Sequence, residues 1–372
     1  MRGEKRFERR TENAAETIRS ATETQYVPRT NNSGGFFSRL FCGRGSGGAR
    51  VIDPNEAAPD SDFHADCFVQ LSKGMTAYRF VEPSTATDDI ADEIPVIVLL
   101  HGLTNCSYMW ADVVDLLCDS EMGPQARVLV FDFYGHGRSP WTGVPITLDV
   151  LVTQTKELLD FLGVVTNSKV SIIGFDLGGA VATGFAAKYP NLCASLTLIN
   201  PIGVKYKPMK NEKMLSRKYV GEYMILNSKN ALVAAQEKEF FDIAPDSPHR
   251  PLVDRQTAMV QWQLDHTPGF LGAMLSAIRL FPLRGMEELY TAVGRHPRPV
   301  MIIWGTEDEV CPYAPCVRKM EGSFPKGCIV DIKECGHNSV FEKFDEVVTE
   351  LLCFHKEIFT DEEDVEFMFG KR

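Results

Sequence analysis

Residues 170–179, Val-Ser-Ile-Ile-Gly-Phe-Asp-Leu-Gly-Gly, join an apolar β-branched run to an alanine-rich pattern that continues to Lys188. The stretch predicts a strand, a sharp turn and a helix in direct succession. Gly174 and Gly178 flank Asp176, and glycines at these positions let the backbone turn tightly. We therefore expect Asp176 at the apex of the turn, above the end of the strand. A carboxylate there is ionised at neutral pH and can form a covalent ester.

The composition is that of a globular protein, with 372 residues of which 44% are hydrophobic. A formal net charge of −11 argues against a general nucleic-acid-binding protein, because such proteins concentrate positive charge. No apolar run has the length needed to span a bilayer, and no secretory segment is apparent. The composition therefore predicts a cytoplasmic protein.

The ten cysteines lack C-x-x-C spacing and are predicted to be reduced, small hydrophobic residues in a reducing compartment. Four of them lie within apolar stretches and are expected to be buried: Cys118, Cys193, Cys328 and Cys353. No metal site is indicated, because the nearest pair, Cys311 and Cys316, lacks histidine partners. No cofactor is indicated either.

Residues 1–65 are predicted to be a disordered basic tail, rich in Arg, Glu, Thr, Ser, Asn and Gly. Within it, one aromatic patch set among arginines is a candidate for weak contact with an anionic membrane: Phe36, Phe37, Phe41 and Cys42. A solvated tail is the alternative interpretation of this patch.

Between the termini, strand patterns alternate with helix patterns, which predicts an α/β fold with a mostly parallel sheet covered on both faces. Residues 68–81 read as a hairpin, and buried strands are expected at 95–100, 127–132, 170–175, 195–199, 300–304 and 328–332. Helical patterns and many aromatic residues interrupt this alternation between 201 and 298. The predicted division is a core at 66–200 and 299–360, an inserted helical cap at 201–298, and an acidic C-terminal tail at 361–372.

Two more polar groups follow strand patterns. Asp308 comes after the strand predicted at 300–304, and His337 follows the one at 328–332. Because the carboxyl ends of parallel strands meet at one edge of the sheet, Asp176, Asp308 and His337 are expected in one crevice. Their chain order is nucleophile, acid and histidine. Glu307 and Glu309 are alternatives for the acid.

Residues 95–350 resemble the α/β-hydrolase fold family of the AB hydrolase-1 type. The resemblance rests on His101-Gly102, on residues 131–139 (Phe-Asp-Phe-Tyr-Gly-His-Gly-Arg-Ser), on the turn around Asp176 and on Gly336-His337. It implies an Asp-His-Asp triad in which Asp176 is the nucleophile, His337 the base and Asp308 the group that orients it. It also implies an oxyanion hole formed by the backbone N–H groups of Leu103 and Leu177.

The family usually has serine at the apex, and an aspartate there resembles the epoxide hydrolases and haloalkane dehalogenases. A carboxylate that attacks saturated carbon gives a stable ester, whereas attack on an ester carbonyl would give a reactive anhydride. Two features depart from those relatives: Leu177 replaces their tryptophan, and residues 101–104 lack the proline of His-Gly-x-Pro. Epoxide hydrolases donate a proton from cap tyrosines, for which the candidates are Tyr206, Tyr219, Tyr223 and Tyr290.

Three functional hypotheses follow. The first is a hydrolase that opens an epoxide or a similar apolar electrophile through an ester at Asp176, acting on a small apolar or lipid-like substrate. The second is a protein similar to esterases and acylglycerol lipases in which aspartate replaces serine. The third is a non-catalytic binding protein on the same fold. Asp308 and His337 argue against the third, because a binding protein does not need them.

Overall fold

The computed structural model describes residues 65–84, 86, 94–119, 122–164, 169–206, 212–227, 229–247 and 250–360. The aromatic patch at Phe36, Phe37, Phe41 and Cys42 and the acidic C-terminal tail lie outside these residues.

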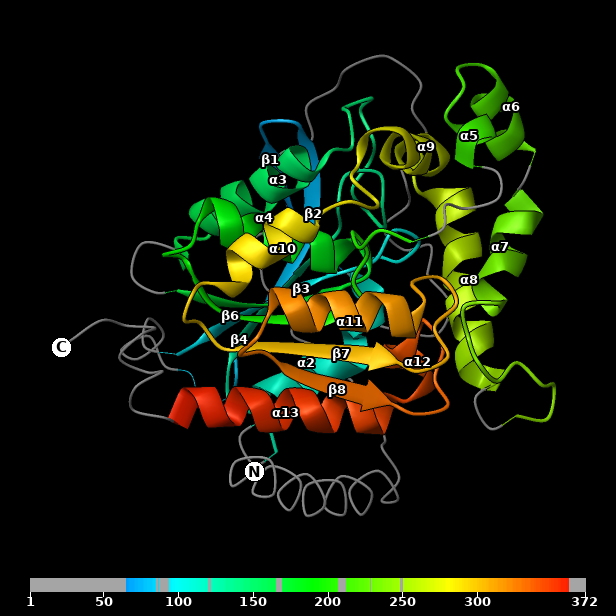
Figure 1. Ribbon diagram of the computed structural model, residues 1–372. Helices are drawn as coiled ribbons and strands as arrows, with labels where there is room; N and C mark the ends of the chain where they lie inside the picture. The colour runs from blue at the N-terminus through cyan, green and yellow to red at the C-terminus, as the bar shows by residue number, and fades with distance from the viewer. Residues whose placement is uncertain are drawn as a thin grey trace.

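An eight-stranded sheet forms the centre of the molecule (Figure 1), in the order β1-β2-β4-β3-β5-β6-β7-β8. Pairing is antiparallel for β1 with β2 and β2 with β4, and parallel for every other pair. This confirms the predicted α/β-hydrolase fold class. The strands are β1 Cys67–Leu71, β2 Gly74–Val81, β3 Val96–Leu100, β4 Arg127–Phe131, β5 Val170–Phe175, β6 Cys193–Ile199, β7 Val300–Gly305 and β8 Cys328–Ile332.

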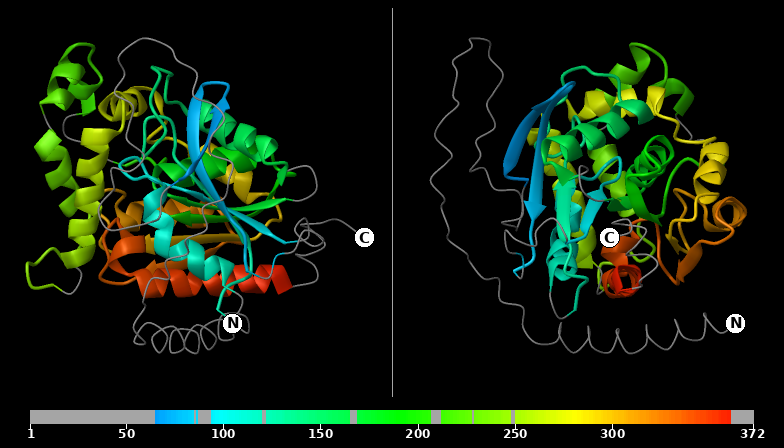
Figure 2. Two further views of the ribbon diagram at one scale, coloured as in Figure 1. Left: turned by 180° about the vertical axis from the view of Figure 1, so that it is seen from behind. Right: turned by 90° about the vertical axis from the view of Figure 1, so that its left-hand side faces the viewer.

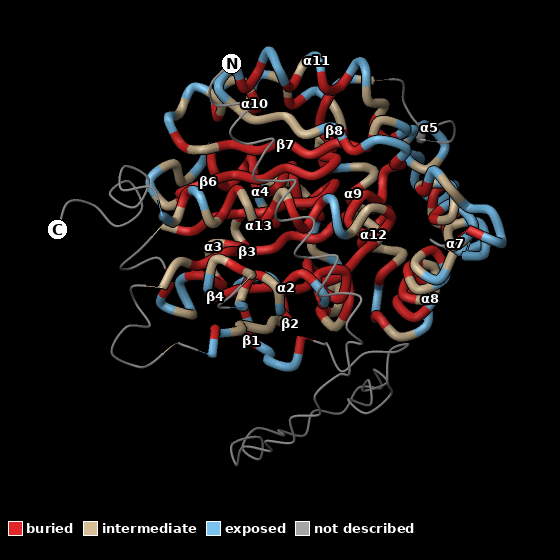
Figure 3. Tube along the Cα trace, turned by 90° about the horizontal axis from the view of Figure 1, so that it is seen from below, coloured by how far each residue is buried: buried red, intermediate tan, exposed pale blue. Residues whose placement is uncertain are grey.

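Strand β3 shows why both faces of the sheet must be covered. Val96, Val98 and Leu100 pack into one hydrophobic cluster, and Ile97 and Leu99 pack into the other. Successive side chains on a strand point to opposite faces, so a continuous apolar run needs helices on both sides. In the tube coloured by burial, the central strands β3–β7 are accordingly buried (Figure 3).

The helices divide between the two faces of the sheet and one of its ends. Helices α3, α4, α10 and α11 cover one face, and α2 and α13 cover the other. The helices before the cap are η2 Ser107–Trp110, α2 Ala111–Cys118, α3 Leu148–Phe161 and α4 Leu177–Lys188. Those after it are α11 Tyr313–Ser323, α12 Ser339–Glu342 and α13 Phe344–Thr360.

The described part of the segment predicted as a cap consists of helices joined by short non-helical stretches. It contains α5 Glu212–Leu215, α6 Val220–Leu226, α7 Lys229–Glu237, α8 Arg250–His266, α9 Phe270–Leu280 and α10 Glu287–Gly294. Figures 1 and 2 show α5–α8 at the end of the sheet toward which the parallel strands point. In contrast, α10 packs on the core with α4 and α11, so the boundaries 201–298 remain a proposal. In the described part of the chain, no helix combines the length and apolar character that crossing a membrane requires.

Cysteine burial follows the prediction only in part. Cys193 is buried, whereas Cys118, Cys328 and Cys353 are half-buried and Cys67 is exposed. Cys328 lies on β8, the last strand of the sheet, where one side lacks a neighbouring strand. A sequence pattern of apolar residues does not reveal which strand ends up at the edge.

The turn between β5 and α4 requires glycine on both sides of Asp176. A Cβ atom at Gly174 would lie 2.3 Å from the carbonyl oxygen of Gly178, and one at Gly178 would lie 2.2 Å from that of Leu100. Both obstacles are backbone atoms, which cannot rotate away as a side chain can. Only glycine lets the start of α4 approach the end of β3 this closely.

We expect Gly178→Ala to lower the free energy of unfolding by about 1–3 kcal/mol or more, because the added methyl group forces backbone displacement. Gly322→Ala is the matched control, since Gly322 lies in α11 with open space where its Cβ would be. In a helix the control substitution should be neutral or stabilising by up to about 1 kcal/mol. Urea unfolding measures the free energy of unfolding of both variants, and equal stability of the two would contradict the expectation.

Candidate active site

Asp176 has the backbone conformation that a sharp strand-to-helix turn imposes. Its φ of 50° and ψ of −115° are unfavourable for a residue with a Cβ atom and cost on the order of 1–3 kcal/mol. The Asp176 N–H donates to the carbonyl of Ile199 at 3.0 Å, and its carbonyl accepts from Gly179 at 3.1 Å and Ile202 at 3.3 Å. These bonds hold the residue in place and leave its carboxyl at the end of β5.

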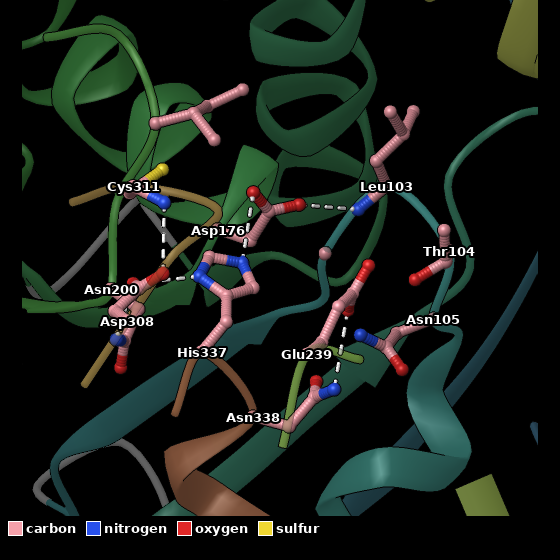
Figure 4. Close-up of polar contacts among 12 residues, drawn as sticks. Leu103, Thr104, Asn105, Asp176, Asn200, Glu239, Asp308, Cys311, His337 and Asn338 are labelled. Carbon is pink, nitrogen blue, oxygen red and sulfur yellow. Dashed lines mark hydrogen bonds and ion pairs between the residues drawn. The ribbon is translucent and has the colours of Figure 1, made fainter. Parts of the chain in front are cut away.

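One oxygen of this carboxylate is held by a backbone N–H group of the loop after β3. Asp176 Oδ2 accepts a hydrogen bond from the N–H of Leu103 at 2.8 Å (Figure 4). Leu177, the other predicted donor, is the first residue of α4, where N–H groups have no partner within the helix. The structure thus shows a bond from one predicted donor, Leu103, to the Asp176 carboxylate, and the role of both donors in stabilising an oxyanion remains a prediction.

Two buried histidines hold the loop that carries Leu103. Nε2 of His136 lies 2.8 Å from the Leu103 carbonyl, and Nε2 of His101 accepts from the Phe133 N–H at 2.9 Å. Burial lowers the pKa of His136 to about 4, and burial together with His136 lowers the pKa of His101 well below its usual value. Both rings are therefore neutral at pH 7 and serve to position the loop.

His337 lies between two carboxylates. Its Nδ1 is 2.8 Å from Oδ2 of Asp308, and its Nε2 is 3.5 Å from Oδ1 of Asp176. Oδ2 of Asp308 also accepts from the Asn200 amide, and Oδ1 accepts from the backbone N–H of Cys311. Asn200 is a site residue that the sequence patterns did not mark.

The structure selects one acid from the three candidates. Asp308 is buried and bonded to His337, whereas Glu307 and Glu309 are exposed. It therefore brings together Asp176, His337 and Asp308, the three residues predicted to form the triad. Their catalytic roles remain predictions.

The charges around His337 favour its protonated form. Burial lowers the pKa of the imidazole, but the carboxylates of Asp308 and Asp176 outweigh this effect and raise the pKa well above its ordinary value. A change that neutralised Asp176 would remove one of these two anions. The pKa of His337 would then fall, and the ring would become a stronger candidate for a general base.

One group of buried residues near His337 has the spacing of metal ligands but is poorly suited to binding a metal ion. Ligand atoms of Asp308, Cys311 and His337 lie within 4.8 Å of one another. However, the imidazole Nδ1 and the Asp308 carboxylate already bond to each other, and burial and the Asp308 charge raise the pKa of the Cys311 thiol well above its usual value. A protonated thiol is not a metal ligand, because the thiolate is the binding form.

A mostly apolar cavity of about 420 Å³ opens above Asp176 and His337. Tyr206 lines this cavity, as predicted for a proton donor. Tyr219 and Tyr223 are 75% and 72% exposed and lie outside the cavity lining, and Tyr290 is fully buried with its hydroxyl bonded to the Ile202 carbonyl. Of the four candidate tyrosines, the structure brings only Tyr206 to the cavity, because the others lie on elements that face solvent or the core.

Glu239, just after α7, is a site residue that the sequence did not reveal. It lines the cavity, and Figure 4 shows its side chain and Asp308 on opposite sides of the His337 ring. Its carboxylate accepts from the side-chain amides of Gln236 at 2.9 Å and Asn338 at 3.2 Å. Burial, with the charge of Asp176 as a smaller cause, raises the pKa of Glu239 to about 7. No motif surrounds Glu239, so the sequence holds no signal for it.

The cap and the His337 loop are tied together by backbone contacts. The N–H of His337 donates to the carbonyl of Glu239 at 2.7 Å. The carboxylate of Glu342, which is 1% exposed, accepts from the N–H groups of Gly336, Phe241 and Asp242 at 2.6–2.9 Å. The position of the histidine therefore depends on the end of α7 and the segment that follows it.

Comparison with known proteins agrees with this architecture. The sequence model of the alpha/beta hydrolase family matches residues 97–350. Among solved structures, a thermophilic esterase from Thermogutta terrifontis superposes with a TM-score of 0.61 at 19% sequence identity, covering 77% of this chain and 96% of that one. At this identity the similarity concerns the fold alone.

Two curated relatives carry names that bear on chemistry. Monoacylglycerol lipase abhd6-B of Xenopus laevis is 26% identical over 255 residues, which cover 67% of this chain and 72% of that protein. Epoxide hydrolase 4 of Mus musculus is 28% identical over 154 residues, 41% of this chain and 39% of that protein. The second match thus spans less than half of either chain.

The raised pKa of Glu239 predicts a pH-dependent cost to stability. The folded protein retains a proton on Glu239 up to about pH 7, whereas the unfolded chain loses it near pH 4.5, so the free energy of unfolding decreases as pH rises through this window. Glu239→Gln removes this titration. The stability of the variant relative to the unaltered protein should therefore increase by up to about 3 kcal/mol between pH 4.5 and pH 8.

Denaturant unfolding across this pH range measures the effect, with Glu307→Gln as a control at an exposed carboxylate. A stability difference between Glu239→Gln and the unaltered protein that stays constant with pH would show that Glu239 does not titrate as described.

Proposed function

Because this chain is a hydrolase that belongs to the alpha/beta hydrolase family, we propose that it hydrolyses an epoxide or a comparable apolar electrophile through a covalent alkyl ester at Asp176. One observation carries the proposal. The Asp176 carboxylate places one oxygen on the Leu103 N–H at 2.8 Å and turns the other toward His337 at 3.5 Å. This arrangement leaves Oδ1 available to attack an epoxide carbon. It also suits the later attack of water on the Asp176 carboxyl carbon, because His337 lies beside it.

In the first step, Asp176 Oδ1 attacks an epoxide carbon and the carbon–oxygen bond of the ring breaks. The electron pair stays on the ring oxygen, which takes a proton and becomes a hydroxyl group. The product of this step is a hydroxyalkyl ester of Asp176. Its formation removes the negative charge of the carboxylate, which lowers the pKa of His337 when a base is next required.

In the second step, His337 takes a proton from water, which attacks the carboxyl carbon of Asp176. Negative charge develops on Oδ2, where the Leu103 N–H already donates. The ester bond then breaks as His337 returns its proton to the departing alkoxide, so that the diol leaves. The second proton of the water passes to the group that protonated the ring oxygen, and the Asp176 carboxylate is restored. Asp308 fixes the ring through Nδ1 and stabilises the imidazolium that forms.

Two cavity residues are candidates for the proton given to the ring oxygen. Burial raises the pKa of the Tyr206 phenol, which therefore carries its proton throughout the neutral range. Glu239, with a pKa of about 7, is about half protonated at neutral pH. A proton donor is most effective when its pKa lies near the working pH, which favours Glu239.

The cavity lining supports a small apolar or lipid-like substrate. Apolar side chains predominate: Leu103, Phe175, Ile202, Met224, Leu232 and Met274 are among them. The names of the frog lipase and the mouse epoxide hydrolase are consistent with this substrate class. A cytoplasmic location remains part of the proposal and rests on composition.

The proposed intermediate can be trapped. In His337→Gln the base for the second step is absent, so the alkyl ester should accumulate after a panel of apolar epoxides is added. Intact-protein mass spectrometry should show an increase equal to the mass of one epoxide, located on the peptide that contains Asp176. The double variant Asp176→Asn/His337→Gln is the control and should show no adduct, because an amide is a poor nucleophile.

The same panel of epoxides, together with acyl esters, distinguishes the proposed epoxide opening from the esterase hypothesis. If the unaltered protein opens no epoxide and His337→Gln forms no adduct, while Asp176→Ser hydrolyses acyl esters, the chain is a serine-hydrolase scaffold with a replaced nucleophile. That result would overturn the proposal.

The two proton donors differ in their expected pH dependence. With Glu239 as donor, the rate of ester formation measured by rapid quenching decreases above about pH 7 as the carboxyl loses its proton. Glu239→Gln should slow this step by about 100-fold or more at low pH and abolish the decrease. If Tyr206 is the donor, Tyr206→Phe slows the step instead and Glu239→Gln leaves it unaffected.

A further inference from the structure

The outer end of the cap exposes an unusual concentration of apolar side chains. We call residues 212–227, which include α5 and α6, the cap tip. Among the described residues, ten large hydrophobic side chains are strongly exposed, and five of them lie within the cap tip: Met214, Tyr219, Val220, Tyr223 and Leu226. Figure 1 shows α5 and α6 at an outer corner of the molecule, away from the sheet, and Figure 3 shows exposed residues along this part of the cap.

The exposed side chains belong to a segment that is held firmly on the body of the cap. The guanidinium of Arg279 on α9 bonds to both carboxylate oxygens of Glu222, at 2.7 and 3.0 Å, and to the carbonyls of Leu215 and Arg217. Four contacts from one side chain fix α5 and α6 in orientation. The fold therefore presents these apolar groups to solvent, although exposing them costs free energy.

The same two helices form part of the cavity wall. Leu215 of α5 and Met224 and Ile225 of α6 line the cavity, while Tyr219, Tyr223 and Leu226 face outward. One thin layer of structure thus separates the exposed apolar surface from the interior of the apolar cavity.

The charge of the cap tip differs from that of the chain as a whole. Between residues 212 and 229, four basic residues outnumber two acidic ones, Glu212 and Glu222, and Glu222 is bonded to Arg279. The basic residues are Lys213, Arg217, Lys218 and, just beyond the cap tip, Lys229. All four are exposed, and the Lys218 ammonium lies 5.1 Å from the centre of the Tyr219 ring. The whole chain carries a formal charge of −11. An anionic partner would therefore attract this corner and repel much of the remaining surface.

We propose that the cap tip docks on an anionic lipid surface, with Tyr219, Tyr223 and Leu226 at the boundary between headgroups and acyl chains. Tyrosine rings favour this boundary, and long basic side chains keep their charge at the headgroups while their alkyl stems pack on apolar groups. Docking there would place the cavity wall of α5 and α6 against the lipid from which an apolar substrate enters. The proposal concerns where the protein meets lipid and does not depend on which bond it breaks.

Sedimentation of the full chain with vesicles tests the proposal. The unaltered protein should pellet with phosphatidylcholine vesicles that contain phosphatidylserine and much less with phosphatidylcholine alone. The apolar variant Tyr219→Ser/Tyr223→Ser/Leu226→Ser should bind at least tenfold more weakly. The charge variant Lys213→Glu/Arg217→Glu/Lys218→Glu should lose about fivefold or more in affinity per charge at low salt, with a smaller loss at high salt.

The control is Phe68→Ser/Phe161→Ser, which removes two exposed aromatic rings, 51% and 58% exposed, from β1 and α3. It should bind as the unaltered protein does. Thermal unfolding midpoints establish that all three variants fold.

Three outcomes would overturn the proposal. Unchanged binding by both cap-tip variants would assign any lipid contact to another part of the chain, such as the basic N-terminal segment. An equal loss in the control would show non-specific adsorption. A concentration-dependent dimer that the apolar variant abolishes, with vesicle binding unchanged, would make a second copy of the chain the partner.

Discussion

The contact between the first turn of α4 and the end of β3 is the constraint on which the rest of the site depends. A Cβ atom at Gly178 would lie 2.2 Å from the Leu100 carbonyl oxygen, so only glycine permits this approach. Because the two elements meet there, the Asp176 carboxylate lies beside the loop that follows β3 and reaches the Leu103 N–H. One backbone contact thus positions the Asp176 carboxylate and the N–H group that faces it, and the helices on both faces of the sheet hold that contact in place.

Around this contact the protein gathers more negative charge than one imidazolium can balance. Asp176 and Asp308 flank His337, and Glu239 faces the same cavity. Burial penalises every ionised carboxylate, and Glu239 responds with a pKa of about 7. The protonation states of His337 and Glu239 are consequently coupled, so a change of charge at one group alters the pKa of the other. Alkylation of Asp176 would also change the charge near His337, and it would favour the neutral form of His337.

The cap contributes directly to this site and does more than cover it. The Glu239 carbonyl holds the His337 N–H, and the buried Glu342 carboxylate joins the segment after α7 to the histidine loop. The hydroxyl of Thr104 bonds to Gln236 of α7, which also links the loop after β3 to the cap. The helices that shape the cavity wall also carry the exposed cap tip. Substrate access, the position of the histidine and the docking of the cap therefore depend on one connected part of the structure.

The sequence by itself determined the sheet class, the turn at Asp176 and the three residues that converge at the strand ends. These features arise from local patterns, namely apolar runs, glycine spacing and chain order, and parallel strands bring their carboxyl ends together wherever the chain places them. Only the tertiary structure decided that Asp308, and not Glu307 or Glu309, is buried against His337. It also revealed Asn200 and Glu239, and it separated Tyr206 from the exposed Tyr219 and Tyr223. Burial and contacts between distant segments set these outcomes, and neither is encoded in the spacing of neighbouring residues.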